Sequence, residues 1–233
     1  MRALLLTLAL AGPSGVGVAE MSAQDFLDRG TFVIVQNGVE IAREEFAIRP
    51  TVDRRGMNGV LSVSTVRFRD REVQHALELS AEQAPLSFQE TSTQGGRVVA
   101  RYSAQLSGGR FSARITSGEG ESAREFPVRP PVVVLGNDAY NELYFVPRAV
   151  TGSTRTISVV RPSDTHAVAA TVETQGTDTI PVGDRAIPAN RYVLRFGDGD
   201  ERRFWMTPNG DLLRVAAPRQ GIVATRTEPP PHL

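Results

Sequence analysis

Apolar and polar residues alternate with a period of two along most of the chain, which is typical of β-strands that bury one face. The clearest example is RVVARYSAQLSGGRFSARITS at residues 97–117, where Gly108-Gly109 predicts a two-residue hairpin turn. A register shifted by one residue would turn the arginines inward, so the turn and the alternation indicate the same pairing. The predicted inward pairs are Leu106–Phe111, Ala104–Ala113 and Tyr102–Ile115.

A second hairpin is predicted around Asn37-Gly38, within TFVIVQNGVEIAREEFAIRP. A two-residue turn at this dipeptide pairs Ile34 with Ile41. The apolar positions then change parity further along the second strand. That change predicts a β-bulge or bend near residues 43–45, of the kind that curves a sheet.

Further alternating runs follow, with turn residues about every eight to twelve positions. The runs lie at 60–68, 73–79, 86–92, 123–128, 156–160, 167–174, 191–196, 202–206, 212–216 and 222–226. They favour an all-β fold in one domain: a large curved antiparallel meander that closes into a half-barrel or a flattened barrel.

One segment departs from this pattern. In PPVVVLGNDAYNELYFVPRA a short apolar strand is followed by Asn137, which is a good helix N-cap, and by Asp138 in the expected first turn. We expect one short helix near 138–145, which Pro147 would stop. This segment would cross between two sheet halves or plug an open end.

The acidic stretch GDGDE at 197–201 offers oxygen ligands for calcium, but an EF-hand loop lies between two helices, whereas strands flank this one. A three-residue hairpin loop with Gly199 in the left-handed conformation pairs Arg195 with Glu201. A two-residue turn would instead place Arg195 opposite Arg202. The stretch therefore predicts a hairpin, and we expect no metal site.

Trp205, the only tryptophan, lies on the outward face of this hairpin, opposite Arg191. The inward residues of the same strands are Tyr192, Leu194, Phe196, Phe204 and Met206. A two-residue turn at 209–210 places Trp205 opposite Arg214, and hence between two guanidinium groups. A type I turn with a glycine bulge places Trp205 opposite Leu213 instead. The sequence leaves both registers open.

The N-terminus has the pattern of a secretory signal peptide at residues 1–19, with cleavage expected after Ala19. Its ten-residue apolar run is shorter than the roughly 20 residues that span a bilayer, so no transmembrane anchor is expected after cleavage. Without cysteine there is no lipid-modified N-terminus. We expect a periplasmic or extracellular protein with a single β domain at 20–228, divisible into halves 28–128 and 129–228, and a disordered tail at 229–233.

Composition removes several function classes. The chain has no cysteine, so the core alone must hold the fold. Its 26 basic residues, all arginine, balance 26 acidic ones, which gives no electrostatic reason to expect a nucleic-acid partner. No G-x-S-x-G elbow, H-E-x-x-H pair or phosphate-binding glycine loop occurs after residue 19, and we expect no cofactor.

Catalytic candidates are few. His75 shares a strand face with Val73 and Leu77 and is interpreted as a packing residue, and His232 lies in the tail. His166 follows Asp164 in one proline-led loop, whereas a catalytic triad converges from separate elements. Paired carboxylates stay open and define one alternative, a secreted glycan hydrolase. The candidate acids are Glu119, Glu121, Asp138, Glu142 and Asp164.

The C-terminal third, VGDRAIPANRYVLRFGDGDERRFWMTPNGDLLRV, resembles a type found in uncharacterised secreted bacterial β domains. The matching positions are Gly183, Ile187, Pro188, Ala189, Tyr192, Phe204, Trp205, Asn209, Gly210, Leu212, Leu213 and Arg214. The layout of the whole chain is also similar to that of the lipoprotein-localisation carriers. That resemblance implies a half-open barrel whose hydrophobic concave face holds acyl chains.

The expected function is that of a non-catalytic envelope protein that binds a hydrophobic or amphipathic ligand, such as a lipid, on the concave face. The expected ligand-binding residues are Tyr102, Arg191, Tyr192, Phe204, Trp205, Met206 and Arg214. A second alternative is a structural or protein-interaction module with an envelope protein as its partner. An exposed, unpaired edge strand would favour that alternative.

Overall fold

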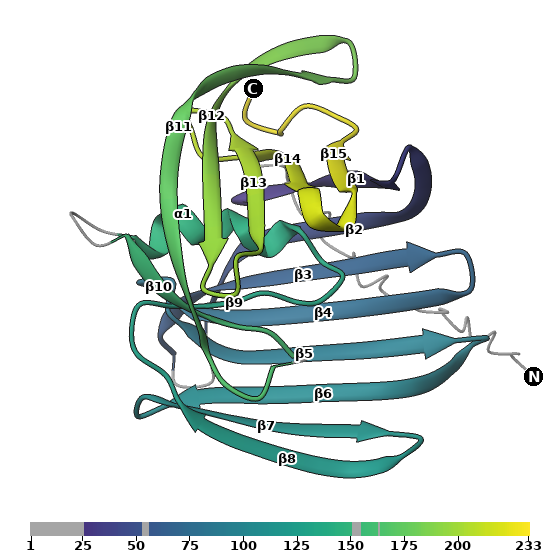
Figure 1. The fold of residues 1–233 in the computed structure, drawn as a ribbon, viewed down its shortest axis with the longest axis vertical. Helices are drawn as coiled ribbons and strands as arrows, with labels where there is room; N and C mark the ends of the chain where they lie inside the picture. Colours follow the sequence, from purple (N-terminus) through teal and green to yellow (C-terminus); the bar gives the residue numbers. More distant parts are fainter. Residues whose placement is uncertain (1–25, 53–55, 151–154, 163) are drawn as a thin grey trace, which may run out of the picture.

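The chain forms one continuous β-sheet that curls around a short helical segment (Figure 1). A computed structural model describes residues 26–52, 56–150, 155–162 and 164–233, so the expected signal peptide lies outside the described residues. The sheet has fifteen strands in the order β8-β7-β6-β5-β4-β3-β2-β1-β15-β14-β13-β12-β11-β10-β9. Only the pair β9–β10 is parallel. The prediction of an all-β antiparallel meander is confirmed.

The strands coincide with the alternating runs of the sequence. The first half consists of β1 (Asp28–Gln36), β2 (Val39–Val52), β3 (Asn58–Phe68), β4 (Arg71–Ser80), β5 (Pro85–Gln94), β6 (Arg97–Ser107), β7 (Arg110–Ser117) and β8 (Gly120–Pro127). The second half consists of β9 (Val132–Val134), β10 (Thr156–Val160), β11 (Val168–Val182), β12 (Arg185–Phe196), β13 (Glu201–Met206), β14 (Leu212–Ala217) and β15 (Ile222–Arg226).

The strand order places the first and last strands at the middle of the sheet and two strands that are consecutive in sequence at its edges. β1 pairs with β15 at the centre, while β8 and β9, which are consecutive in sequence, are the two edge strands. The connection between them, at 128–131, therefore spans from one edge of the sheet to the other. In Figure 1 the strands β3–β8 lie side by side, and β11–β13 run across their direction.

Two predicted hairpins have the expected register. Gly108-Gly109 pairs Leu106 with Phe111 and continues as predicted to Arg101–Thr116. The GDGDE loop pairs Arg195 with Glu201, and Gly199 has the expected positive φ of 81°. In both hairpins the turn residues and the strand alternation agree, which leaves a single register that buries the apolar side.

The predicted pairing at the Asn37-Gly38 hairpin is wrong. Ile34 pairs with Ala42 instead of Ile41, because the β-bulge lies at Ile41 and not near residues 43–45. The earlier bulge changes the parity two residues sooner than predicted. As a result Ala42, and Glu44 after it, point to the interior.

The turn at 209–210 combines the two registers that the sequence left open. Thr207 N–H donates to the Asp211 carbonyl at 2.9 Å across a loop with Gly210 at φ +94°, as the glycine-bulge turn requires. A second irregularity between Trp205 and Met206 then restores the pairing of Trp205 with Arg214. Local turn chemistry and the inward alternation are thus both satisfied.

The helical segment begins and ends later than predicted. Its first part is the 3₁₀ helix η2 (Asn141–Phe145), and α1 (Val146–Ala149) continues it. Pro147 does not stop the segment, because it occupies the first turn of α1, where its missing N–H has no intrahelical acceptor. Asn137 is not the N-cap. Tyr140 holds that position without a side-chain cap, and Glu44 of the sheet accepts from the Tyr140 N–H instead.

The main core lies between the inner face of the sheet and this helical segment, which Figure 1 shows inside the curl. All five residues of η2 are buried. Across β5–β8 an aromatic row packs against the core, with neighbouring ring centroids 5.0–6.5 Å apart. The row consists of Phe88, Tyr102, Phe111 and Phe126.

A buried ion pair connects the first and last strands where β1 meets β15. Arg226 and Asp28 are 2.8 Å apart, and both side chains are fully buried. The Arg226 guanidinium also donates to the carbonyls of Leu212, Glu228 and Arg29. Most of its donors thus find acceptors, as a buried guanidinium requires.

The C-terminal residues, expected to form a tail, lie against the start of the described chain. His232 Nε2 is 3.0 Å from the carbonyl oxygen of Phe26. Pro230 is buried in the same region.

Candidate functional site

The inward residues expected to bind a ligand belong to the main core. Phe204 and Met206 are fully buried, and Tyr192 stacks on Phe204 with ring centroids 5.3 Å apart. These residues form one cluster with side chains of η2 and α1. Tyr102 lies in the aromatic row, and it also lines a small cavity described below.

The outward residues of the same prediction form a second group. Trp205 packs against a small separate core and donates from Nε1 to Asp178 at 2.6 Å. Arg191 forms an ion pair with Asp178 at 3.2 Å, and Arg214 lies over the Trp205 ring at 5.3 Å. The small core consists of Ile180, Val182, Ile187, Ala189 and Leu213. Trp205, with Arg191 and Arg214 beside it, therefore covers the small core formed by β11, β12 and β14.

A row of polar side chains crosses four adjacent strands on the inner face of the sheet. Strand pairing places Ser64 of β3 beside His75 of β4, His75 beside Glu90 of β5, and Glu90 beside Tyr102 of β6. Ser64 and His75 are buried. Polar groups at inward positions are unusual, because each loses its hydration on folding.

The helical segment brings a second set of polar groups to this row. Glu142 Oε1 lies 3.6 Å from His75 Nδ1, and Glu90 Oε2 lies 3.9 Å from the same nitrogen. The other oxygen of Glu142 accepts from the Gly136 N–H. Asn141 donates from Nδ2 to Ser62 at 2.7 Å. We name Glu44, Ser62, Ser64, His75, Glu90, Asn141 and Glu142 the buried polar cluster.

Glu44 is the fully buried carboxylate of this cluster. It accepts from the N–H groups of Tyr140 at 2.9 Å and Asn141 at 3.3 Å, and so anchors the start of η2 to the sheet. Burial raises the pKa of Glu44 to about 7, against the effect of these two hydrogen bonds, and the nearby Glu142 adds to the rise. The carboxyl group therefore titrates near neutrality.

The pKa values of two more groups of the cluster, Glu90 and His75, shift in the same direction. Burial raises the pKa of Glu90. Burial opposes the charge on His75, yet the neighbouring carboxylates of Glu142, Glu90 and Glu44 raise the pKa of the imidazole above its ordinary value. The cluster thus retains protons, because several carboxylates share one poorly hydrated volume.

Because Gly136 has no side chain, the His75 ring can lie directly against its backbone. A Cβ at this position would lie 2.5 Å from two ring atoms of His75 and 3.2 Å from Glu142 Oε2. We therefore expect Gly136→Ala to lower the free energy of unfolding by about 1–3 kcal/mol, because the buried ring must move. Urea unfolding followed by Trp205 fluorescence measures this loss. Gly118→Ala, where a Cβ would meet no atom within 4 Å, is the matched control and should change stability by less than about 0.5 kcal/mol.

The sequence contains a signal for this cluster, namely acidic residues at inward strand positions. After the bulge, Glu44 occupies an inward position between Ala42 and Phe46, and Glu90 follows Phe88 at the same parity. A charged residue at a core position requires a partner or a function. His75 is buried, as its position predicted, but carboxylates and not only apolar groups surround it.

The remaining candidates lie apart from the cluster. His166 is exposed beside Thr165, and Asp164 pairs with Arg161 at 2.9 Å. Of the five candidate acids only Glu142 belongs to the cluster, and Glu119 and Glu121 are exposed. Within the described residues no group of three or more His, Asp or Glu side chains is placed to hold a metal ion.

A cavity of about 230 Å³ adjoins the buried polar cluster. Glu90, which belongs to the cluster, lines this cavity together with Tyr102, Asn137 and Arg124. Arg124 donates to the carbonyl of Asp164 at 3.0 Å, near Pro162 of the cavity lining. Ala100, Arg101, Ile115 and Pro162 complete the lining.

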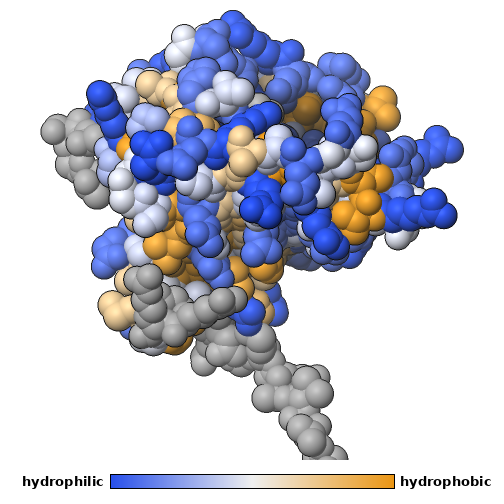
Figure 2. Space-filling view, turned by 90° about the horizontal axis from the view of Figure 1, so that it is seen from below, coloured by the Kyte–Doolittle hydropathy of each residue, from blue (hydrophilic) through white to orange (hydrophobic). Residues whose placement is uncertain are grey.

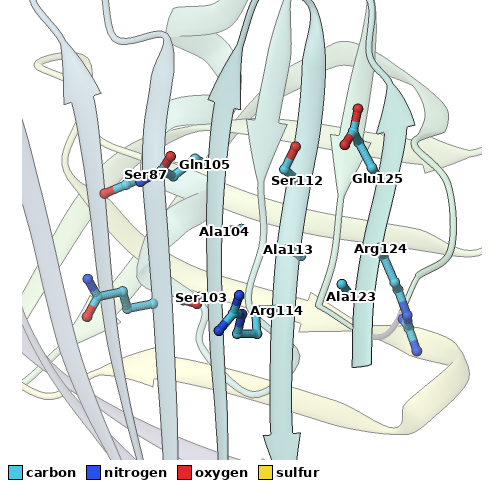
Figure 3. A pocket seen from close by; sticks show the side chains of 11 residues that line it. Ser87, Ser103, Ala104, Gln105, Ser112, Ala113, Arg114, Ala123, Arg124 and Glu125 are labelled. Atoms are coloured by element: carbon cyan, nitrogen blue, oxygen red, sulfur yellow. The ribbon is translucent and has the colours of Figure 1, made fainter. Parts of the chain in front are cut away.

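A larger, shallow depression of about 540 Å³ lies on the outer face of β5–β8 (Figure 3). Its side chains stand in the rows that strand pairing dictates, with Ser87, Gln105, Ser112 and Glu125 in one row. Most of the lining side chains are polar, and Glu125 is paired with Arg110. This surface is the solvated side of the sheet.

A groove of about 360 Å³ lies where the 128–131 connection passes the ends of β5–β7. We name it the proline groove. Its apolar residues come from four segments and are Ala84, Pro85, Leu106, Val128, Pro130, Pro131, Val132 and Ala149. Figure 2 views the molecule from the β7–β8 side and shows apolar residues exposed among hydrophilic ones on this face.

The polar side chains of Gln83 and Arg148 also line the proline groove. Gln83 Oε1 is buried and has no hydrogen-bond partner within the described residues. Arg148 donates to the carbonyls of Tyr144 at 2.6 Å and Gly210 at 3.2 Å, and forms no ion pair with any described carboxylate. Burial lowers the pKa of Arg148. The Arg148 guanidinium is thus a positive charge in the groove, attracted by the more distant carboxylates of Asp211 and Asp28, and Glu82 also lines the groove.

No helix within the described residues is long and apolar enough to cross a membrane. No family model and no curated protein matches the chain. Among solved structures, the chain is similar to the β-barrel-like protein of the domain of unknown function DUF1849 from Brucella abortus, with a TM-score of 0.50 and 12% identity. The match covers 86% of this chain and 95% of that chain. At this identity the similarity concerns the fold alone, and that fold is β-barrel-like.

Proposed function

We propose that the protein is a non-catalytic binding protein for a small amphipathic molecule with an apolar chain and an acidic head group, held in the proline groove. The proposal is based on the observation that apolar side chains from four segments line the groove together with Arg148. A volume of about 360 Å³ is within the usual range of small-molecule sites. The apolar chain would lie along the prolines, and the head group would face Arg148.

The proposed site differs in place from the concave face expected from the sequence. Phe204 and Met206 of that face pack into the main core, whereas the proline groove opens at the end of the sheet. We further propose that the protein acts in the periplasm or outside the cell, because residues 1–19 have the pattern of a cleaved signal peptide.

Titration calorimetry with dodecanoate tests the proposal. We expect saturable binding of dodecanoate, and at least tenfold weaker binding of dodecyltrimethylammonium, whose charge Arg148 repels. Ala84 is exposed and lines the groove, so Ala84→Trp should block binding without disturbing the core. Ala123→Trp, at an exposed alanine on the outer face, should leave binding unchanged. Equal affinities for the two head groups, or full binding by Ala84→Trp, would contradict the proposal.

Edge strand β8 favours a second candidate, a protein-interaction module. Residues 120–123 of β8 are all exposed, and the strand ends the sheet. An additional strand from an envelope protein could pair there. The charges of Glu121, Arg124 and Glu125 oppose such pairing, which is how many sheet edges avoid association. Ala123→Pro, which removes a backbone N–H that points away from β7, should weaken any complex of this kind in a pull-down assay.

A further inference from the structure

The buried polar cluster contains more unpartnered polar atoms than folding alone explains. Six buried atoms of five side chains have no hydrogen-bond partner within the described residues. They are Ser64 Oγ, His75 Nδ1, His75 Nε2, Glu90 Oε2, Asn141 Oδ1 and Glu142 Oε1. Native proteins leave few such atoms, and a concentration of them at one place indicates a missing occupant.

The chemistry of these atoms specifies what would satisfy them. Asn141 donates from Nδ2 to Ser62, which fixes the amide and leaves Oδ1 as an acceptor. As carboxylates, Glu90 and Glu142 offer free oxygens that also accept, and both oxygens lie within 4 Å of the same nitrogen of His75. The cluster therefore has an excess of acceptors and of negative charge. A complementary group is a cation with several N–H donors.

We propose that the buried polar cluster binds the ammonium group of a small primary amine. A primary ammonium carries three N–H donors, and the cluster offers three unpartnered oxygens that can accept, on Glu90, Glu142 and Asn141. Guanidinium is larger and planar, and a quaternary ammonium has no N–H to donate. This site is separate from the proline groove and does not depend on the function proposed for it.

The adjoining cavity gives the ligand a route and a size limit. Glu90 belongs both to the cluster and to the wall of this cavity of about 230 Å³. The organic part of the amine would occupy the cavity beside Tyr102 and Ile115. Arg101 and Arg124 also line the cavity, so a second positive charge, as in a diamine, would be repelled.

Binding of an ammonium group should compete with protons. His75 faces Glu90 of β5, Glu142 of η2 and Glu44 of β2, while Arg71 and Asp138 act on Glu90 from the edge of the cluster. An ammonium among these carboxylates takes the place of the charge on a protonated imidazole. Simple alkylamines keep their charge up to a pH of about 10. We therefore expect the affinity to rise about tenfold or more between pH 5.5 and pH 8.

Nuclear magnetic resonance of the imidazole rings tests this proposal on the complete folded protein. His75 is one of three histidines, and the variants His166→Gln and His232→Gln, both at exposed positions, assign its signals. Methylammonium chloride is the probe, and tetramethylammonium chloride, with equal charge and no N–H, is the control. We expect a saturable shift of the His75 signals with methylammonium alone, stronger at the higher pH.

Variants separate binding from a general salt effect. Glu90 is only partly buried, so Glu90→Gln should keep the fold, verified by unchanged shifts of His166, and abolish the saturable response. Glu78→Gln changes an exposed acid on the outward face of β4 and should respond like the unmodified protein. A cluster that holds ordered water only would show no saturable shift. That result, an equal response to tetramethylammonium, or a normal response of Glu90→Gln would each overturn the proposal.

Discussion

Arg226→Met is expected to lower the free energy of unfolding by about 3–5 kcal/mol, which is the usual effect of breaking a buried ion pair. Arg226 and Asp28 are both fully buried, so the substitution leaves an unpaired carboxyl group in the interior. It also removes the donors that serve the carbonyls of Leu212 and Arg29, at the place where the first and last strands, β1 and β15, pair. Urea unfolding followed by Trp205 fluorescence measures the loss.

The double variant Asp28→Asn with Arg226→Met should recover part of this stability, because it no longer buries an unpaired acid. Arg43→Ala is the control. It breaks an exposed ion pair with Glu40 and should cost no more than about 1 kcal/mol. A cost for Arg226→Met that is no larger than that of Arg43→Ala would show that the central ion pair does not hold the first and last strands together.

The protein is expected to be more stable at pH 5 than at pH 8. Burial raises the pKa of Glu44 to about 7 and that of Asp28 to about 6. An acid whose pKa is raised in the folded state binds protons more tightly there than in the unfolded chain. Its stabilising effect is complete below the ordinary pKa and is lost as the pH rises through the folded value. The raised pKa of His75 acts in the same direction.

For Glu44 alone, the difference between about 7 and the ordinary 4.5 corresponds to about 3 kcal/mol. Glu44→Gln should therefore remove about this much of the fall in unfolding free energy between pH 5 and pH 8. The amide oxygen of the variant can still accept from the Tyr140 N–H, so the fold should persist. Urea unfolding at pH 5, 6, 7 and 8 gives the comparison.

Glu45→Gln is the matched control, because Glu45 is the next residue and its side chain is 58% exposed. Its profile should follow that of the unmodified protein. A Glu44→Gln profile as steep as that of the unmodified protein would show that Glu44 does not retain its proton near neutrality. Greater stability at pH 8 than at pH 5 would contradict the expectation that burial raises the pKa values of Glu44 and Asp28 in the folded protein.

The strands and most hairpin registers could be predicted because they depend on neighbours in sequence. The turn at Gly108-Gly109 and the loop with Gly199 each permit one register that buries apolar residues. The position of the bulge at Ile41 could not be predicted from the sequence. A bulge at Ile41 and a bulge near residues 43–45 would both turn the later apolar residues of β2 inward. The observed position turns Glu44 inward, where the N–H groups of η2 are, and no local signal indicates that partner.

The sequence by itself determined an all-β antiparallel fold, the strand positions, the outward face of Trp205 and the burial of His75. Pairing geometry between adjacent strands is sufficient for these features. Only the tertiary structure decided that η2 fills the inner face, that acids from β2, β5 and η2 surround His75, and that the 128–131 connection borders a groove. The physical reason is desolvation. Whether a charge is paired or a cavity is filled depends on segments that are distant in sequence and meet only when the sheet curls.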